Sequence, residues 1–305
     1  MSNSTLNTLI IAFGMLFVVT NSLALGMRVH VGQVLVHFAK NWRFAVVVLL
    51  INFVVLPILV VGFAALVDIP PDIKIGYCIV AFAAGAPFAP LLTGLAKGDV
   101  ATSTTLFVAL VVGTVIVVPL ALPVTVRAIV PSAADVSAWA VAWPLLAFLA
   151  APLALGCVIR LRYPRISVGA AKWLQWFSIA ALLLYVNVFI VGYLQLFGQA
   201  WGSGAYIAAF AVPILGILLG SLLSRRDRRR RHAGIITTAQ RSVGGAIVVT
   251  VFAYTQPLAN VSVTIINTVG ILILLVFSLE WGRAATGALA KAPAAEPGSP
   301  QRKPA

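Results

Sequence analysis

The chain has 305 residues, of which 61% are hydrophobic and 9% charged, and its formal net charge is +14. Soluble domains carry about 25% charged residues, so this composition excludes an ordinary soluble protein and indicates a membrane protein with several spans. In a soluble protein the basic excess would point to nucleic acid, but in a membrane protein it is typical of cytoplasmic loops. The two cysteines, Cys78 and Cys157, lie in apolar stretches and predict neither a disulfide framework nor a metal site.

Nine apolar stretches predict nine transmembrane helices, because most of them reach the roughly 20 residues that cross a bilayer. The expected fold is an all-α polytopic membrane protein in which residues 1–283 form one transmembrane domain. Residues 284–305 are rich in Ala, Pro, Gly and Lys and are expected to form a disordered cytoplasmic tail. The start lacks the positive region of a signal peptide, so the first span is expected to be retained. The predicted spans are 6–27, 44–67, 73–97, 101–126, 138–159, 171–196, 203–224, 234–256 and 259–281.

The positive charges fall on one side of this arrangement. Of the 21 lysines and arginines, 18 lie in loops or ends that share a side, whereas Lys74 and Arg127 lie on the other. Because cytoplasmic loops carry the excess of Lys and Arg, we expect the amino end outside and the carboxyl end in the cytoplasm. The predicted location is a plasma membrane, and the high Ala and Arg usage favours a bacterial inner membrane. Residues 28–43 mix apolar and basic side chains and are expected to rest on the cytoplasmic interface.

Span 73–97 cannot be one straight helix. Gly85, Pro87 and Pro90 stand near its middle, and each proline removes a backbone donor and clashes with the carbonyl four residues earlier. Broken backbone is tolerated in lipid only where it is buried or lines a cavity. A simple proline kink is the alternative, but two prolines with a glycine predict a real interruption.

Span 234–256 holds Arg241, the only fixed charge deep inside an apolar stretch. A charge there costs about 2.5–3.5 kcal/mol on insertion scales, so it needs a partner, a water-filled cavity or a ligand. The following pair Gly244–Gly245 is expected to break the helix. We interpret the stretch as one half of a substrate site; the alternative is an arginine that snorkels to the interface or binds neighbouring carbonyls. The polar residues around it are Thr237, Thr238, Gln240 and Ser242.

Paired interrupted spans in the two halves of a chain indicate a secondary-transporter site at the bilayer midplane. If the halves are inverted repeats of five helices, this chain lacks the first helix of the ten-helix form. Spans one to four would then match spans six to nine, which aligns the breaks in the third and eighth spans.

Three segments, taken in order and spacing, carry a family resemblance: INFVVLP at 51–57, LTGLAKGDVATSTTLFVAL at 92–110 and TAQRSVGGA at 238–246. They resemble the bile acid:sodium symporter family, over about residues 8–282. The resemblance implies a panel domain and a core domain, with the two discontinuous helices crossing in the core. It also implies transport of organic anions by alternating access.

The residues that hold sodium in that family are largely replaced. The family uses a Ser-Asn pair at the first crossover, hydroxyls of the next helix and a Glu in the second crossover. By this resemblance Gln240 is kept, Asn52 stands at a side-chain amide position, and Arg241 stands where the motif usually has Asn. The other vestigial ion-site positions are Ala89 and Pro90 at the Ser-Asn pair, Ser103 and Phe107 at the hydroxyls, and Ile236 at the Glu.

No acidic residue lies in the interior of a predicted span, so neither the carboxylate of a sodium site nor that of a proton-coupled carrier is evident. We therefore predict a carrier of a small or amphipathic organic anion, with no cofactor and with sodium coupling weakened or absent. Arg241 would either replace the cation permanently or pair with a carboxylate or sulfonate substrate, which half-helix N-termini also favour. Asn267 matches a family substrate-contact position, although helix packing is an equal interpretation. The predicted substrate-binding residues are Arg241, Gln240, Thr237, Thr238, Pro87, Pro90, Ser103 and Asn267.

Other functions stay open. The same fold could carry sodium-coupled symport through residual backbone oxygens, a channel, or a non-transporting ligand-binding sensor. An intramembrane enzyme would need paired carboxylates, a histidine cluster or an activated nucleophile, whereas the spans contain no acid and the three histidines are expected in loops. The expected partners are the small anion and the lipid bilayer, with no nucleic acid. The substrate and the oligomeric state are left undetermined.

Overall fold

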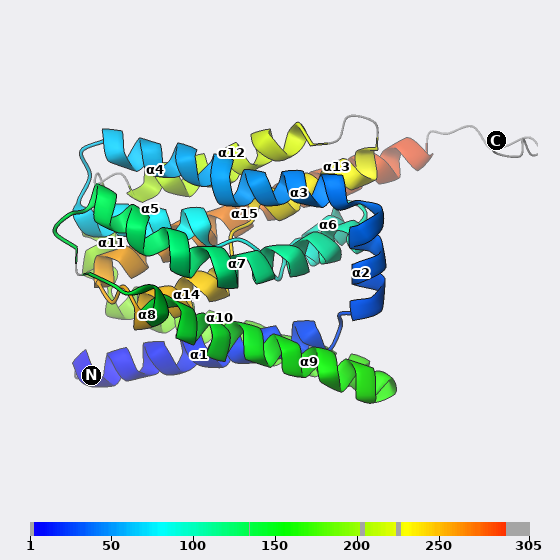
Figure 1. Cartoon of the computed structure of the whole chain (residues 1–305), viewed down its shortest axis with the longest axis horizontal. Helices are drawn as coiled ribbons and strands as arrows, with labels where there is room; N and C mark the ends of the chain where they lie inside the picture. Colours follow the sequence, from blue (N-terminus) through cyan, green and yellow to red (C-terminus); the bar gives the residue numbers. More distant parts are fainter. Residues whose placement is uncertain (1–2, 134, 202–204, 224–226, 291–305) are drawn as a thin grey trace, which may run out of the picture.

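The computed structural model describes residues 3–133, 135–201, 205–223 and 227–290, and in this part of the chain every regular element is helical (Figure 1). The helices form two layers. In Figure 1 the lower layer contains α1 and α9, with α10 behind them, and the upper layer contains the remaining long helices.

The lower layer, here called the α1 layer, is held together by a close contact between helix backbones. A Cβ on Gly26 of α1 would lie 2.1 Å from the carbonyl oxygen of Leu153, and one on Gly156 would lie 2.3 Å from that of Leu23. Small residues allow such an approach between membrane helices. The layer consists of α1 (Asn3–Gly26), α8 (Ala138–Pro144), a π-helical turn η2 (Leu145–Ala150), α9 (Ala151–Arg162) and α10 (Pro164–Gly192).

The upper layer, here called the core layer, contains the two interrupted spans. The amphipathic helix α2 (Val31–Lys40) leads from α1 to it, standing upright at the right of Figure 1, and α11 (Leu194–Ala200) follows α10. The core layer consists of α3 (Trp42–Leu50), the π-helical turn η1 (Ile51–Val55), α4 (Leu56–Leu66), α5 (Pro71–Phe82), α6 (Ala89–Leu95), α7 (Val100–Ile129), α12 (Ala205–Ser221), α13 (Arg228–Ala239), α14 (Val243–Phe252) and α15 (Pro257–Ala290).

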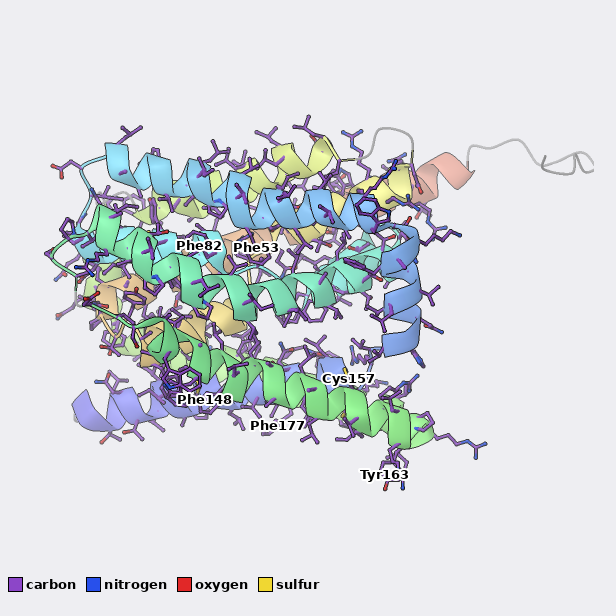
Figure 2. The ribbon with its side chains drawn as sticks, in the orientation of Figure 1. Phe53, Phe82, Phe148, Cys157, Tyr163 and Phe177 are labelled. Atoms are coloured by element: carbon purple, nitrogen blue, oxygen red, sulfur yellow. The ribbon has the colours of Figure 1, made fainter. Side chains whose placement is uncertain are left out.

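Seven helical stretches of the described residues are long and apolar enough to cross a membrane. Each corresponds to one predicted span. The predicted span 203–224 is represented by the shorter α12, and the predicted span 73–97 by the two short helices α5 and α6. Large apolar side chains cover the outside, as Figure 2 shows for Phe177, and such a surface suits contact with lipid. The seven stretches are 5–26, 42–66, 100–129, 138–162, 164–192, 228–252 and 257–286.

The two π-helical turns were not predicted. Each stands directly before a proline near the start of the next helix, Pro57 in α4 and Pro152 in α9. A proline ring clashes with the carbonyl four residues earlier in an α-helix, and a wider turn relieves that clash. Helical periodicity alone does not distinguish such a turn from a regular helix.

Other boundaries differ from the sequence expectations. Within the segment 28–43, residues 31–40 form a helix with no buried side chain, and the placement of this segment on the cytoplasmic interface stays a prediction. The last helix runs to Ala290, beyond the predicted start of the tail, and the remaining tail residues lie outside the described part. Two histidines expected in loops, His37 and His232, lie in helices. His232 is buried because its ring stacks on Trp281 at 4.6 Å between centroids and its Nδ1 lies 3.0 Å from the Ala96 carbonyl oxygen.

Candidate functional site

The first interruption lies between α5 and α6. The chain is extended over residues 83–86, turns at 87–88, and resumes a helix at Ala89. Gly85 has a φ of +77° and packs tightly, because a Cβ there would lie 2.7 Å from the backbone nitrogen of Val111. The predicted interruption is present. Pro90 does not contribute to it, since it stands in the first turn of α6, where a helix needs no backbone donor.

The second interruption lies between α13 and α14 and consists of Gln240, Arg241 and Ser242. The expectation that Gly244–Gly245 opens the helix was wrong. Both glycines lie in the first turn of α14, and neither has a positive φ. The helix restarts because the Ser242 hydroxyl caps it, accepting a hydrogen bond from the backbone nitrogen of Gly245 at 3.2 Å.

The two interrupted segments are bonded to each other. The backbone nitrogen of Ser242 donates to the carbonyl oxygen of Ala83 at 2.8 Å. Thr114 of α7 holds the first segment from the other side: its hydroxyl accepts from the Ala84 nitrogen at 3.2 Å and donates to the Ala84 oxygen at 2.9 Å. Unpaired backbone groups are costly in the middle of a membrane, and these bonds satisfy them where the helices stop.

Arg241 fills the space between the two interruptions, and its side chain is 4% exposed. Its Nε donates to the Val80 carbonyl oxygen at 2.9 Å, its Nη2 to that of Ala81 at 2.5 Å, and its Nη1 to Oδ1 of Asn52 at 2.8 Å. Val80 and Ala81 belong to the last turn of α5, and the carbonyl end of a helix carries partial negative charge. The guanidinium therefore supplies a fixed positive charge to that end through three directional bonds.

Asn52 connects Arg241 to α13. It lies in the π-helical turn η1, is fully buried, and donates through Nδ2 to the Val48 carbonyl oxygen at 2.9 Å and to the Thr238 hydroxyl at 3.5 Å. Single π-helical turns occur frequently at functional sites. The widened turn thus places an amide between the arginine and the end of α13.

A chain of three fully buried hydroxyls lies beside these bonds. Thr93 of α6 donates to the Ser103 hydroxyl of α7 at 3.1 Å, and Ser103 lies 3.1 Å from the Thr237 hydroxyl of α13. Thr93 was not among the predicted residues, although it falls in the segment 92–110. Ala89 and Ile236, which the family resemblance assigns to ion-site positions, pack together in a small apolar cluster. Phe107, assigned in the same way, packs in the main core.

Gln240 and Asn267 border a narrow cavity next to Arg241. Asn267 donates to the Val263 carbonyl oxygen at 3.0 Å. The Gln240 side chain is 2% exposed, and neither its Nε2 nor its Oε1 has a partner among the described residues. Leaving a buried polar group unpaired costs about 1–3 kcal/mol, so this amide marks a position where a polar ligand or a water molecule would be stabilised.

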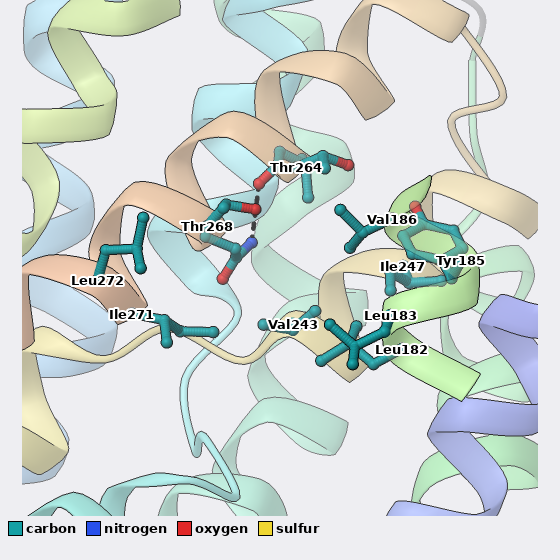
Figure 3. A pocket seen from close by; sticks show the side chains of 12 residues that line it. Leu182, Leu183, Tyr185, Val186, Val243, Ile247, Thr264, Thr268, Ile271 and Leu272 are labelled. Atoms are coloured by element: carbon teal, nitrogen blue, oxygen red, sulfur yellow. Dashed lines mark hydrogen bonds between the residues drawn. The ribbon is translucent and has the colours of Figure 1, made fainter. Parts of the chain in front are cut away.

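Two further cavities lie between the α1 layer and the core layer. One, here called the crossover cavity, has a volume of about 180 Å³ and is lined by apolar side chains of α10, α14 and α15, with Thr264 and Thr268 on one side (Figure 3). Asn267 also lines it. The other is bordered by both interruptions, through Pro87 and Ser242, and by the α1 layer. Asn21 and Ser22, which supply the polar groups from α1, were not predicted, because isolated polar residues in an apolar helix usually serve packing.

The structure thus divides seven of the eight predicted residues into two sets, and the eighth, Pro90, stands in the first turn of α6. Five of them, Arg241, Gln240, Thr237, Thr238 and Ser103, are buried inside the core layer, whereas Pro87 and Asn267 line cavities that reach the α1 layer. Only two ion pairs occur in the described part of the chain, Arg127–Asp135 and Arg283–Glu280, and both are exposed.

A family model described as "Sodium Bile acid symporter family" matches residues 14–200, which is more than half of the chain. The matched region contains the first interruption and ends before the second. No individual curated protein matches the chain significantly.

Proposed function

Because the chain belongs to the sodium bile acid symporter family, we propose that it is a secondary transporter that carries an organic anion by alternating access without a bound sodium ion. Members of this family are transporters rather than enzymes. The observation that carries the sodium-independent part of the proposal is the set of three bonds from Arg241 to Val80, Ala81 and Asn52.

Electrostatics supports a resident cation at this position. The α5 carbonyl end and the Asn52 oxygen are acceptors that would suit a metal ion, and here a guanidinium already occupies them. A second positive charge at 4 Å would be repelled by about 4 kcal/mol at an effective dielectric constant of about 20. The bonds to Val80 and Ala81 also match the alternative in which Arg241 simply binds neighbouring carbonyls. Of the two functional roles that the sequence leaves open for Arg241, replacement of the cation agrees better with the geometry than direct pairing with a substrate.

The arrangement of helices supports the inverted-repeat transporter fold with nine membrane helices. Each half contains a broken helix followed by a long one: α5–α6 before α7, and α13–α14 before α15. The first helices of the two halves, α1 and α10, pack against each other in the α1 layer. We assign the α1 layer as the panel domain and the core layer as the core domain, with the amino end outside and the carboxyl end cytoplasmic in a plasma membrane.

The cavities favour an amphipathic anion as the substrate. Leu182, Val186 and Ile271 offer an apolar wall, while Asn267 and the unpaired Gln240 offer amides. The N-terminus of α14, which begins at the second interruption, would attract the anionic group because helix N-termini carry partial positive charge.

One observation favours the alternative of sodium-coupled symport: the hydroxyl chain of Thr93, Ser103 and Thr237 remains at the crossing and offers oxygen ligands. A non-transporting sensor on the same fold would bind the anion without moving it. The thermal-shift and counterflow measurements below distinguish both alternatives from the proposal.

Replacing sodium by potassium at constant ionic strength is expected to leave the melting temperature of the purified protein unchanged. Because Arg241 already supplies the positive charge, an organic anion that binds should raise the melting temperature equally in both salts. The measurement is a thermal-shift series over organic anions, followed by counterflow in proteoliposomes. Stabilisation by sodium alone would restore symport, and stabilisation by an anion that shows no counterflow would support the sensor.

A further inference from the structure

Two cavities lie one after the other along the contact between the two layers. The crossover cavity is the first. The second, here called the end cavity, has a volume of about 170 Å³ and lies where α10 and α14 end and α15 begins. It is more polar than the crossover cavity. Its lining comes from Asn7, Ile10 and Ile11 of α1, from Phe189 of α10 and Tyr193 directly after it, from Thr250 and Val251 of α14, from Thr255 before α15, and from Pro257 and Asn260 of α15.

The same helix faces line both cavities. On α10 the lining passes from Leu182 and Val186 to Phe189 and Tyr193, in steps of three or four residues. The steps are similar on α14, from Val243 and Ile247 to Thr250 and Val251, and on α15, from Val263 back to Asn260. Residues three or four apart share one face of a helix, so the cavities are consecutive parts of one path between the layers.

Tyr185 stands between the two cavities and is 1% exposed. Its hydroxyl donates to Oδ1 of Asn260 at 3.2 Å. The Thr250 hydroxyl lies 3.3 Å from the same oxygen and 3.0 Å from the Ile247 carbonyl oxygen, so its single proton is shared between these two acceptors. The Tyr185 ring stacks on Phe189 with 5.7 Å between centroids. The bond from Tyr185 to Asn260 joins α10 of the α1 layer to α15 of the core layer, and Thr250 of α14 lies beside it.

The fit around the Tyr185 ring is tight on the side of α1. A Cβ on Gly14 would lie 3.2 Å from Cδ2 of the ring and 3.2 Å from Cγ2 of Ile247. Four helices, α1, α10, α14 and α15, therefore meet at this level, with a cavity on either side of it.

We propose that Tyr185, Asn260 and Thr250 form a gate that closes the path between the end cavity and the crossover cavity. This inference rests on the proposed transport function. The ring obstructs the path, and the hydrogen bond from its hydroxyl to Asn260 holds it across the contact between the layers. Movement of one layer relative to the other breaks the bond between Tyr185 and Asn260 and withdraws the ring, which opens the crossover cavity toward the end that carries Asn7 and Pro257.

Cysteine accessibility tests the gate without requiring a known substrate. The chain has two cysteines, so a cysteine-free background needs only Cys78→Ala and Cys157→Ser. Val263→Cys then places a single thiol in the crossover cavity at a residue that is 1% exposed. A membrane-impermeant maleimide is applied separately to each side of sealed vesicles, and the labelling rate is measured.

Labelling is expected to be slow with Tyr185 present. Tyr185→Ala and Asn260→Ala should each raise the rate about tenfold from the Asn7 side and leave the other side unchanged, which corresponds to about 1.4 kcal/mol in the opening equilibrium. Tyr185→Phe, which keeps the ring and loses the hydroxyl, should give an intermediate rate. The matched control is Tyr206→Ala, since this half-buried tyrosine bonds to the Phe197 carbonyl oxygen outside the path.

Equal labelling rates in the Tyr185, Asn260 and Tyr206 variants would overturn the gate, even if transport were established. Conversely, failure of every anion to show counterflow would contradict the proposed transport function while leaving a side-specific change in labelling intact. If Tyr185→Ala does not yield folded protein, Tyr185→Phe and Asn260→Ala decide the question.

Discussion

Uptake is expected to be lost when Arg241 is replaced by alanine, while folded protein is still obtained in the membrane. The substitution removes three bonds that tie the second interruption to the end of α5 and to Asn52. The carbonyl oxygens of Val80 and Ala81 and the Asn52 oxygen then lose their donor, at a cost of about 1–3 kcal/mol for each group that stays unpaired. Uptake should fall to background because the crossing of the two interruptions loses its geometry.

The same variant distinguishes a resident cation from a substrate-binding group. If Arg241 acts as a cation for the helix end, millimolar guanidinium or sodium should raise the melting temperature of Arg241→Ala and restore part of its uptake. The original protein should show no such effect. Arg241→Lys should recover less than half of the uptake, because an ammonium is a point charge that cannot match three separated acceptors.

The exposed Arg43, which lies over the ring of Trp42, provides a matched control. Arg43→Ala removes one positive charge outside the crossing and should leave uptake and its salt dependence unchanged. Normal uptake by Arg241→Ala would remove the residue from the site. Rescue by the substrate anion alone, with no response to added cations, would instead assign Arg241 to substrate pairing.

Replacing Gly85 by alanine is expected to produce the largest structural effect of any single glycine substitution in the interrupted spans. The residue has a φ of +77°, which costs a residue with a side chain roughly 1–2 kcal/mol. The new methyl group would also lie 2.7 Å from the Val111 nitrogen, and overpacking costs about 1–3 kcal/mol more. The first interruption must therefore shift, and both the melting temperature and uptake should fall.

Gly62→Ala is the control for this prediction. Gly62 lies within α4, and a Cβ there would meet nothing within 4 Å. Since alanine is favoured over glycine in a helix by about 1 kcal/mol, this variant should be as stable as the original protein or more so. Equal melting temperatures for the Gly85 and Gly62 variants would contradict the packing described at the first interruption.

The sequence located Arg241 correctly as the unusual residue, because a lone charge in an apolar span is visible without any structure. Its partners could not be predicted, because two of them are backbone carbonyl oxygens about 160 residues away along the chain. Every residue has a backbone carbonyl, so the sequence does not show which one will accept a bond. Asn52 could be selected only through the family resemblance. The π-helical turn that aims its side chain has the same residue pattern as a regular helix.

The wrong assignment of the second interruption has a similar cause. Glycine makes the backbone flexible at Gly244–Gly245, but flexibility alone does not end a helix. The new helix begins instead where the Ser242 hydroxyl can cap it. At the first interruption the inference from Gly85 and Pro87 holds, since both stand in non-helical backbone. Composition also could not show that Tyr185 meets Asn260, because that contact depends on how the two layers pack.

The α1 layer and the core layer are joined by segments of the chain, and these segments limit how far one layer can move relative to the other. Among the described helices, the chain passes from one layer to the other three times: after α1, between α7 and α8, and after α10. The shortest direct connection, residues 130–137, can reach at most about 26–29 Å when fully extended. Deletions in this connector should therefore reduce the distance that one layer can move relative to the other, without changing the binding residues. The length of the connector would then limit the rate of transport.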